Sequence, residues 1–348
     1  MKHVNIPIFI PHLGCPNDCA FCNQHKITGH MQFSAESVIP QIEGVLKTLN
    51  GQKAQIAFFG GSFTGIDRPL MIKLLEIGQD YIKSDMVDSL RCSTRPDYIN
   101  EEILDILLQY GVKTIELGVQ STSDKVLSAC SRGHNAECAV KAMGAVKAHG
   151  FELIGQMMTC LPESTLEDEI NTASDICKSG ADGARIYPLV VFKDTALEKM
   201  VQTGKYIPVG EEENIFRAKE VKKVFLKHGV PVIRLGLQAQ DNLTASGDIS
   251  AGGYQPAIGA MADSAIYLDI ITEQLEKYDK AVLKNAFATV NVARGETSSA
   301  VGMRKINKTI LTEKYGLYKI KVVERDALAP FEASVRIVPD KRRCCGCI

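Results

Sequence analysis

Short apolar runs alternate with longer amphipathic stretches through the first two-thirds of this 348-residue chain. The apolar runs, typical of buried strands, cover residues 6–11, 54–59, 89–93, 114–119, 153–158 and 184–191. Helical periodicity separates them at residues 35–49, 69–82, 101–110, 137–149 and 165–179. Strand–helix repetition requires parallel strands joined by helical crossovers. Because the six units lack a dinucleotide-binding fingerprint, they favour an α/β fold of the partial (βα)6 TIM-like barrel type over a doubly wound sheet.

The pattern changes after about residue 204. Helices are expected at residues 211–228 and 258–278, strands at 232–238, 286–292 and 318–323, and a glycine-rich loop facing the barrel mouth at 243–259. The sequence therefore predicts a core barrel at residues 1–235, a small C-terminal α+β extension at residues 236–340, and a cysteine-rich tail at residues 341–348.

The composition is that of an ordinary globular protein, with 45% hydrophobic and 23% charged residues and a formal net charge of −1. This balance excludes a predominantly disordered chain, and it gives no bulk attraction to DNA or to a membrane surface. The apolar run at residues 6–10 is too short for a signal peptide and is interrupted by Pro7. We therefore expect a cytoplasmic protein, in which clustered cysteines indicate metal binding or catalysis instead of disulfides.

Three of the 11 cysteines follow the first expected strand directly, in the sequence Cys15-Pro-Asn-Asp-Cys19-Ala-Phe-Cys22. Such a loop lies at the carboxyl ends of the strands, where barrels carry their chemistry. Three neighbouring thiolates suit three irons of a cubane iron–sulfur cluster, whose fourth iron would stay open to a small molecule. Two alternatives are a zinc site completed by His12 or His25, and three unrelated thiols.

The C-x3-C-x2-C spacing, with Phe21 before the third cysteine, resembles the signature of the radical S-adenosylmethionine (SAM) superfamily. The resemblance implies a [4Fe–4S] cluster held by Cys15, Cys19 and Cys22, whose open iron chelates the amino and carboxylate groups of SAM. It also implies reductive cleavage of SAM to a 5′-deoxyadenosyl radical, which abstracts a hydrogen atom from the substrate. A reductase, a flavodoxin or a ferredoxin would supply the electron.

A second motif, Gly60-Gly61-Ser62, follows the second expected strand. Paired glycines allow the backbone to approach a ligand closely, although a glycine turn also occurs at strand ends without a ligand. Beside the cysteine triad, the motif resembles the Gly-Gly sequence of the superfamily, which implies that Gly60, Gly61 and Ser62 hold the SAM amino group. Ser62 stands where the superfamily usually carries a glutamate.

Four residues at or near later strand ends are further candidate SAM contacts. Gln120 and Arg132 resemble a pair in oxygen-independent coproporphyrinogen oxidases that contacts the SAM ribose and carboxylate. Met157 and Tyr187 lie on the next two expected strands and are candidates for the adenine, with burial in the core as the alternative.

Arg95, in the sequence Ser-Thr-Arg-Pro-Asp, is a candidate contact to SAM or to the substrate. The alternative for this segment is a helix entry capped by Asp97 or Asn100, which leaves Arg95 unexplained.

The Gly-Gly-Ser-Phe-Thr, Ser-Thr-Arg-Pro-Asp, Gly-Val-Gln-Ser and Arg-Gly-His sequences, in this order, resemble the catalytic subunit of Elongator and its short bacterial relatives. That subunit has a longer cysteine spacing and an acetyltransferase domain. Because this sequence shows no acetyl-coenzyme A pyrophosphate loop, we do not carry over acetyl transfer to tRNA.

The resemblance implies radical SAM chemistry on an unidentified substrate, for which an RNA base is one candidate. Basic residues between Arg294 and Arg325 are candidate RNA contacts, although the net charge of −1 favours an ordinary solvated surface. One alternative is the same chemistry on a small metabolite or a porphyrin-like molecule. Another is a non-catalytic regulatory protein that binds zinc or iron.

A second cysteine cluster, Cys344, Cys345 and Cys347, lies at the end of the sequence after three basic residues. We interpret it as part of a flexible tail with reactive thiols, with an auxiliary iron–sulfur site as the alternative.

Overall fold

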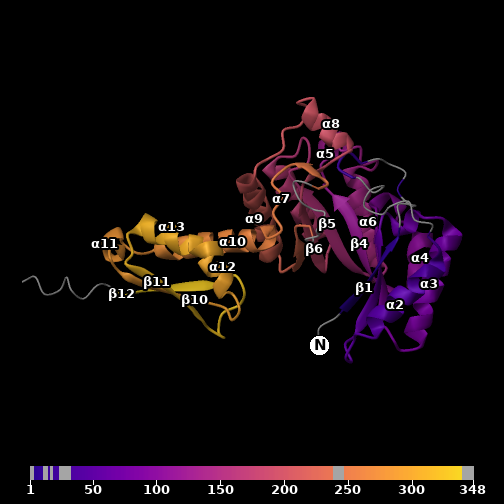
Figure 1. Cartoon of the computed structure of the whole chain (residues 1–348), viewed down its shortest axis with the longest axis horizontal. Helices are drawn as coiled ribbons and strands as arrows, with labels where there is room; N and C mark the ends of the chain where they lie inside the picture. The colour runs from indigo at the N-terminus through magenta and orange to yellow at the C-terminus, as the bar shows by residue number, and fades with distance from the viewer. Residues whose placement is uncertain (1–3, 11–14, 16–18, 23–32, 238–246, 339–348) are drawn as a thin grey trace, which may run out of the picture. The chain divides into compact units, whose positions relative to one another are not determined.

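The first part of the chain folds around one parallel sheet. The computed structural model describes residues 4–10, 15, 19–22, 33–237 and 247–338. Seven strands pair in parallel in the order β1-β2-β3-β4-β5-β6-β8 (Figure 1). They are β1 (Val4–Ile10), β2 (Ala54–Gly60), β3 (Ser89–Thr94), β4 (Val112–Gln120), β5 (Glu152–Thr159), β6 (Gly183–Pro188) and β8 (Val232–Leu235). The sheet confirms the partial TIM-like barrel and carries β8 as a seventh parallel strand.

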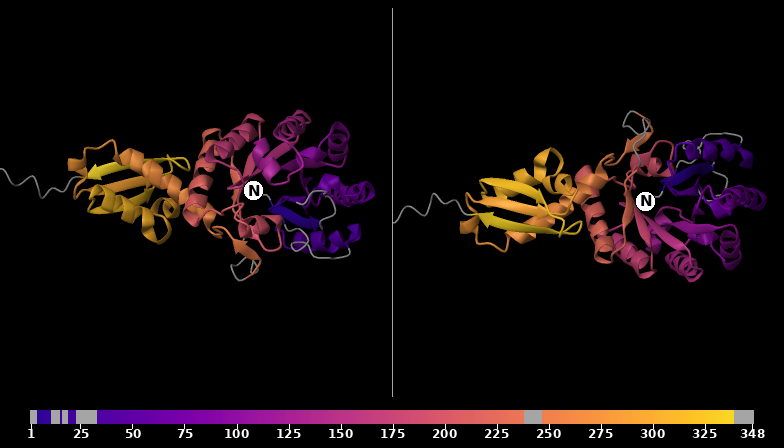
Figure 2. Two further views of the ribbon diagram at one scale, coloured as in Figure 1. Left: turned by 90° about the horizontal axis from the view of Figure 1, so that it is seen from above. Right: turned by 90° about the horizontal axis from the view of Figure 1, so that it is seen from below.

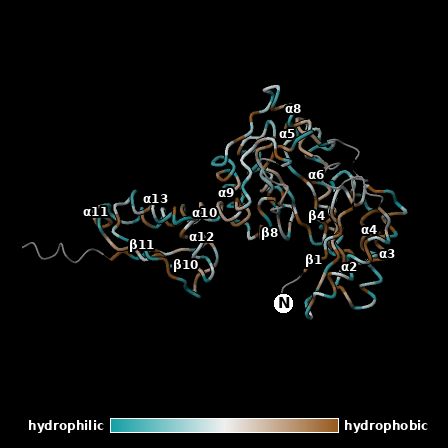
Figure 3. Tube along the Cα trace, in the orientation of Figure 1, coloured by the Kyte–Doolittle hydropathy of each residue, from teal (hydrophilic) through white to brown (hydrophobic). Residues whose placement is uncertain are grey.

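Helices cover one face of this sheet, because each crossover between neighbouring strands contains a helix (Figure 2). They are η1 (Ala35–Val38), α2 (Ile39–Leu46), η2 (Phe63–Gly65), α3 (Arg68–Lys83), η3 (Pro96–Tyr98), α4 (Glu101–Gln109), α5 (Asp124–Ala129), α6 (Ala136–Ala148), α7 (Leu166–Lys178), α8 (Ala196–Gln202) and α9 (Glu211–Lys227). Alternate strand residues such as Ile6, Ile56 and Ile115 are fully buried against these helices. Hydrophobic residues accordingly run along the strands in Figure 3.

The opposite face of the sheet, which we call the concave face, carries polar side chains. Gln55 donates to the hydroxyl of Ser89 at 2.9 Å and to that of Thr114 at 3.1 Å. Thr114 in turn donates to a carboxylate oxygen of Glu152 at 2.7 Å. Gln55, Ser89 and Thr114 are buried, so these bonds satisfy groups that water does not reach. The network ties four neighbouring strands together near their amino ends.

A second compact unit begins after Tyr254. The division falls later than residue 235, because β9 (Ile249–Ala251) pairs antiparallel with β7 (Val191–Phe192) of the first unit. The strand β9 lies within residues 243–259, where the sequence analysis expected a loop. That expectation was wrong for these three residues, and residues 238–246 lie outside the described part.

The second unit is a three-stranded sheet, in the order β11-β10-β12, with helices packed on one face. Its elements are α10 (Ile258–Leu275), α11 (Lys280–Leu283), β10 (Phe287–Val292), α12 (Thr297–Val301), η4 (Met303–Lys305), α13 (Ile306–Tyr315), β11 (Lys319–Glu324) and β12 (Ala333–Val338). The sequence analysis missed β12, although Ala333, Val335 and Ile337 alternate with more exposed residues. None of the described helices has the length and apolarity that crossing a bilayer requires.

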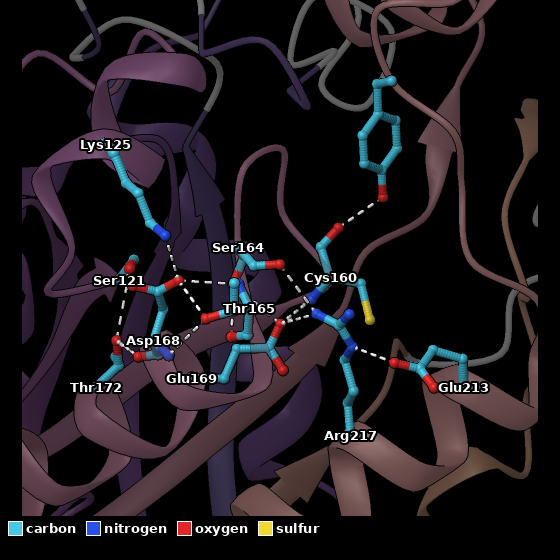
Figure 4. A network of polar contacts seen from close by, with 11 residues as sticks. Ser121, Lys125, Cys160, Ser164, Thr165, Asp168, Glu169, Thr172, Glu213 and Arg217 are labelled. Atoms are coloured by element: carbon cyan, nitrogen blue, oxygen red, sulfur yellow. Dashed lines mark hydrogen bonds and ion pairs between the residues drawn. The ribbon is translucent and has the colours of Figure 1, made fainter.

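Helix α7 begins with a capping box (Figure 4). The hydroxyl of Thr165 accepts from the amide of Asp168 at 3.2 Å, and the Asp168 carboxylate accepts from the Thr165 amide at 2.9 Å. Lys125 lies 3.0 Å from the same carboxylate. Burial acts to raise the pKa of Asp168, but the Thr165 hydrogen bonds and Lys125 outweigh it and lower the pKa to about 2.

Replacing Asp168 with asparagine is expected to lower the free energy of unfolding by about 1–2 kcal/mol at pH 7. The folded-state pKa of Asp168 is depressed, so its stabilising contribution is full above the unfolded-state value of about 3.9 and is lost as the pH falls towards 2. Urea unfolding should therefore show a smaller difference from wild type at pH 3 than at pH 7. Glu137→Gln, on an exposed turn of α6, is the control and should change little. A difference that does not shrink in acid would contradict this assignment.

Candidate active site

The cysteine loop after β1 is fixed by two backbone hydrogen bonds from distant segments. The amide of Ala20 donates to the carbonyl of Cys130, which follows α5, at 2.9 Å. The carbonyl of Ala20 accepts from the amide of Leu197 in α8 at 2.8 Å. Ala20 is buried in a small apolar cluster, and Phe21 packs against that cluster. The loop position is therefore set by α5 and α8, both of which follow strands at their carboxyl ends.

Two buried guanidinium groups face the sulfur of Cys19. Nη1 of Arg132 lies 3.4 Å from this sulfur, and Nη1 of Arg95 lies 3.7 Å from it. Both oxygens of Asp97 hold Arg95, at 2.8 and 2.9 Å. Arg132 also donates to the carbonyl of Gly118 at 2.6 Å. A negatively charged group bound at this loop therefore meets two fixed guanidinium groups, of which Arg95 is already paired with Asp97.

Cys15 lies within reach of the same two arginines. Burial raises the pKa of the Cys15 thiol, while the charges of Arg95 and Arg132 and a hydrogen bond from the Ser62 backbone act in the opposite direction. Cys22 is half-buried, and its amide donates to the carbonyl of Cys19 at 2.9 Å. The cysteine loop and the glycine motif thus form one site.

The donor set of the cysteine loop is suited to an iron–sulfur cluster, whose protein ligands are thiolates. Among the described residues, no three His, Cys, Asp or Glu side chains converge as ligands of one metal ion. Arg95 and Arg132 would offset the negative charge of a thiolate-bound cluster. Outside the described residues lie His12, His25, Cys344, Cys345 and Cys347.

The glycine motif lies beside the cysteine loop because β1 and β2 are neighbours, with Ile10 paired to Gly60. Gly60 has a φ of 123°, and a Cβ atom there would overlap the carbonyl oxygen of Ile10. Gly61 follows half-buried, and the buried hydroxyl of Ser62 shares a hydrogen bond with that of Thr94 at 2.8 Å. Only glycine permits this approach of the two strand ends, and Ser62 ties them to β3.

Gln120 ends β4 in an unusual conformation. Its φ is 64°, its side chain is almost fully buried, and its Oε1 has no hydrogen-bond partner within the described structure. A left-handed glutamine costs about 1–3 kcal/mol, and such strain clusters at functional sites. Gly118 leaves room here, since a Cβ would lie 3.0 Å from Nη2 of Arg132 and 3.1 Å from Nε2 of Gln120. The buried oxygen marks a position that a polar ligand can satisfy.

Tyr187 and Met157, the two residues considered for contact with the adenine, lie on opposite faces of the sheet. Tyr187 lies on the concave face, where its hydroxyl is 3.3 Å from Nη1 of Arg185. Met157 is instead fully buried between the sheet and the helices. Its neighbour Met158 is half-buried and pairs in register with Tyr187. Strand alternation therefore gives the concave position to Met158 and the core position to Met157.

The segment after β3 combines a helix cap and an ion pair. Asn100 accepts from the amide of Ile103 at 2.9 Å and caps α4. Asp97 does not cap; it holds Arg95 against the cysteine loop. The sequence left open what Arg95 does, because no local pattern indicates a partner as distant as Cys19.

A cavity of about 420 Å³ opens beside Arg132 and includes His134, which the sequence analysis did not select. Burial, followed by the positive charge of Arg132, lowers the pKa of His134 to about 4. The imidazole is therefore neutral at pH 7. Its Nε2 is buried and has no partner in the described part of the chain.

A buried ion pair fixes the turn after β5 (Figure 4). The carboxylate of Glu169 accepts from the amide of Cys160 at 2.6 Å and from the hydroxyl of Ser164 at 3.0 Å. Arg217 pairs with the same oxygen at 3.1 Å. Cys160 has a φ of 62°, so these contacts hold a strained turn. The network joins α7 to α9 and positions the carboxyl end of β5 beside the site.

The structure is a partial α/β barrel in which a cysteine loop, a glycine turn and two buried arginines lie together at the carboxyl ends of the strands. Comparison with family models shows that the radical SAM superfamily matches residues 9–176, and the Radical_SAM C-terminal domain matches residues 181–267. The chain belongs to the radical SAM superfamily.

Individual relatives show how far the similarity extends. The uncharacterized protein MJ0486 of Methanocaldococcus jannaschii is 30% identical over 267 residues, which cover 73% of this chain and 80% of that protein. A tRNA uridine(34) acetyltransferase of Methanocaldococcus infernus is 34% identical over 145 residues, or 40% of this chain and 27% of that protein. The structure of Methanocaldococcus infernus Elp3 with an N-terminal deletion has a TM-score of 0.59 at 22% identity, over 76% of this chain and 62% of that chain. It shows the same fold.

Proposed function

We propose that this protein is a radical SAM enzyme in which Cys15, Cys19 and Cys22 hold a [4Fe–4S] cluster. When bound and reduced, the cluster supplies the electron for cleavage of SAM to a 5′-deoxyadenosyl radical, which abstracts hydrogen from the substrate. The observation that carries the proposal is the approach of two buried guanidinium groups to Cys19, in a loop beside a glycine turn.

The residues around the loop have the donors and acceptors that SAM needs. The turn of Gly60, Gly61 and Ser62 offers backbone groups to the amino group. The unpartnered Oε1 of Gln120 is suited to a ribose hydroxyl, and the buried, unpartnered Nε of Arg132 is suited to a carboxylate. Tyr187 and Met158 are the concave-face candidates for the adenine.

Anaerobic reconstitution with iron and sulfide tests this proposal. We expect visible charge-transfer absorbance and, with SAM and a reductant or a flavodoxin, ferredoxin or reductase donor, formation of 5′-deoxyadenosine. A protein that instead binds one zinc per chain and leaves SAM intact would be the regulatory metal protein of the alternative.

We propose an RNA base as the substrate, since the relative from Methanocaldococcus infernus is named for tRNA and the second unit has a suitable surface. One face of its sheet lies opposite the helices of that unit (Figure 2). Phe287 begins β10 and Tyr318 directly precedes β11, and their exposed rings lie 4.8 Å apart at this end of the sheet. Exposed aromatic rings on a sheet are stacking platforms for single-stranded bases.

Positive charge accompanies these rings. Lys321 and Arg336 flank Thr289 on the adjoining strands, and Lys319 flanks Phe287. All three cations are exposed, and among the described residues none has a carboxylate within 4.0 Å. Phosphates of an RNA would meet charges that no acidic group neutralises.

Replacing both Lys321 and Arg336 with alanine is expected to weaken tRNA binding and to reduce the salt slope of log K by about 1.4, the value for two lost phosphate contacts. Filter binding over a salt series measures this slope. Lys280→Ala, an exposed cation at the start of α11 and outside the basic residues 294–325, is the control and should leave the slope unchanged. Absence of tRNA retention by the wild type at every salt concentration would favour the small-molecule alternative.

A further inference from the structure

Three arginines and one fully buried carboxylate lie on the concave face of the sheet. Arg91 is on β3, Glu116 on β4, Arg185 on β6 and Arg234 on β8. Strand alternation places them there, because the residues next to them in sequence, such as Cys92 and Ile186, belong to the core under the helices. Neither the cysteine loop nor the glycine motif involves these four residues.

Glu116 cannot neutralise this group of arginines. Nη1 of Arg91 and Nη2 of Arg185 both lie 2.7 Å from the same oxygen, Oε1. The exposed fraction of the side chain is 10% for Arg91, 15% for Arg185 and 2% for Glu116. One carboxylate therefore serves two guanidinium groups that water reaches poorly, and one positive charge remains unbalanced.

Arg234 adds to this excess. It pairs in register with Arg185 on the neighbouring strand and is half-buried. Among the described residues, no carboxylate lies within 4.0 Å of it. Glu152, at the amino end of β5, accepts from Thr114, and Asp88, near the amino end of β3, lies 3.6 Å from Lys53.

Arg185 is held across the face with part of its donor capacity unused. Its guanidinium carbon lies 5.6 Å from the ring centre of Phe59 on β2, and Nη1 lies 3.3 Å from the Tyr187 hydroxyl. Its Nε is buried and has no partner within the described structure. A buried donor without an acceptor is costly, and an anionic ligand would satisfy it.

The accessible part of the concave face lies next to Arg185. Phe59, Gln156, Arg185 and Tyr187 are all half-buried, whereas Gln55, Ser89 and Thr114 nearer the amino ends are buried. Gly118, Gln156 and Arg185 form one row of the sheet, and Gln120 lies two residues farther along β4. Because β4 is irregular between Gly118 and Gln120, Gln120 pairs with Met157, one residue beyond Gln156. The row therefore lies about 3 Å below the level of Gln120, at 3.3 Å per residue.

We propose that Arg185 and Arg234 form an anion subsite, which binds a phosphate or carboxylate group of the substrate beside the SAM-binding strand ends. Glu116 and Arg91 are positioning residues that hold Arg185 across the face. The assignment to the substrate rests on the proposed function, whereas the anion site itself depends only on these charges. Phe59 and Tyr187 would form the walls of the subsite.

Thermal unfolding of the reconstituted, unreduced protein tests the site without SAM or a reductant. Inorganic phosphate or acetate is titrated while chloride keeps the ionic strength constant. We expect a saturable rise in Tm with phosphate, with acetate or with both, and the stronger of the two identifies the anion class. Arg185→Gln and Arg234→Gln should each raise the apparent Kd at least about tenfold.

Glu116→Gln should have the opposite effect and lower the apparent Kd for the anion severalfold, because it removes the carboxylate that competes with the anion for Arg185. Arg68→Gln, on the surface of α3, is the matched control and should behave as wild type.

If the ion-pair cluster had only a structural role, Glu116→Gln and Arg185→Gln would both lower the Tm and leave the response of the protein to anions unchanged. That result, or the absence of any response in the wild type, would overturn the proposal. A protein that responds to anions at Arg185 and Arg234 but leaves SAM intact would refute the proposed function and retain the anion site.

Discussion

Cys19→Ala is expected to abolish both cluster assembly and SAM cleavage. Cys19 is the middle ligand of the proposed cluster, and both buried guanidinium groups of the site face its sulfur. Removing the thiol also leaves Arg95 and Arg132 without this contact in a buried environment. Because loss of an outer-shell partner alone weakens metal binding about 10–100-fold, loss of a ligand should reduce bound iron at least tenfold. Iron per chain and 5′-deoxyadenosine yield measure the effect after anaerobic reconstitution.

Cys177→Ala is the matched control for this substitution. Cys177 is a half-buried cysteine of α7 that packs against the core beneath the sheet. The control should retain the iron content and SAM cleavage of the wild type. If Cys19→Ala kept its iron, the triad would not be the ligand set.

Gly60→Ala is expected to cost about 2–6 kcal/mol of unfolding free energy, the sum of a strained backbone and a steric clash. The φ of 123° is rare for residues with a side chain, and the new Cβ would overlap the backbone carbonyl of Ile10. The neighbouring strand end must therefore shift, and the cysteine loop that follows Ile10 shifts with it. Urea unfolding followed by circular dichroism measures the loss, and equilibrium dialysis should show weaker SAM binding.

Gly144→Ala tests whether the effect depends on the position of the glycine. Gly144 is an exposed residue of α6, and a Cβ atom there meets nothing within 4 Å. Alanine should stabilise this helix by about 0.5–1 kcal/mol, since glycine is the poorer helix former. Equal stability of Gly60→Ala and wild type would show that β1 and β2 do not approach each other as described.

The sequence predicted the strands of the barrel well because each is a contiguous apolar run bounded by helical periodicity. It also placed the cysteine loop and the glycine motif at the carboxyl ends of β1 and β2, since both directly follow their strands. It did not predict β9, a short strand in a segment rich in glycine and serine. Short strands carry too few alternating residues for the period to stand out.

Within the candidate site, too, the sequence pattern could not predict the position of every residue. Met157 and Met158 are adjacent and chemically identical, and the face that each occupies depends on the register of β5 with β6. Shifting a strand by one residue exchanges its two faces, so composition alone cannot select the methionine beside a ligand. The structure places Met158 on the concave face and Met157 in the core.

The order of the barrel strands and their crossover helices could be predicted from the sequence, as could the barrel class, because these depend on local patterns of residues close together along the chain. The contacts of Arg95 and Arg132 with Cys19, and the sharing of Glu116 by Arg91 and Arg185, could not be predicted in this way. Those partners are brought together by parallel strand pairing, and the free energy that selects one register is spread over the whole buried core.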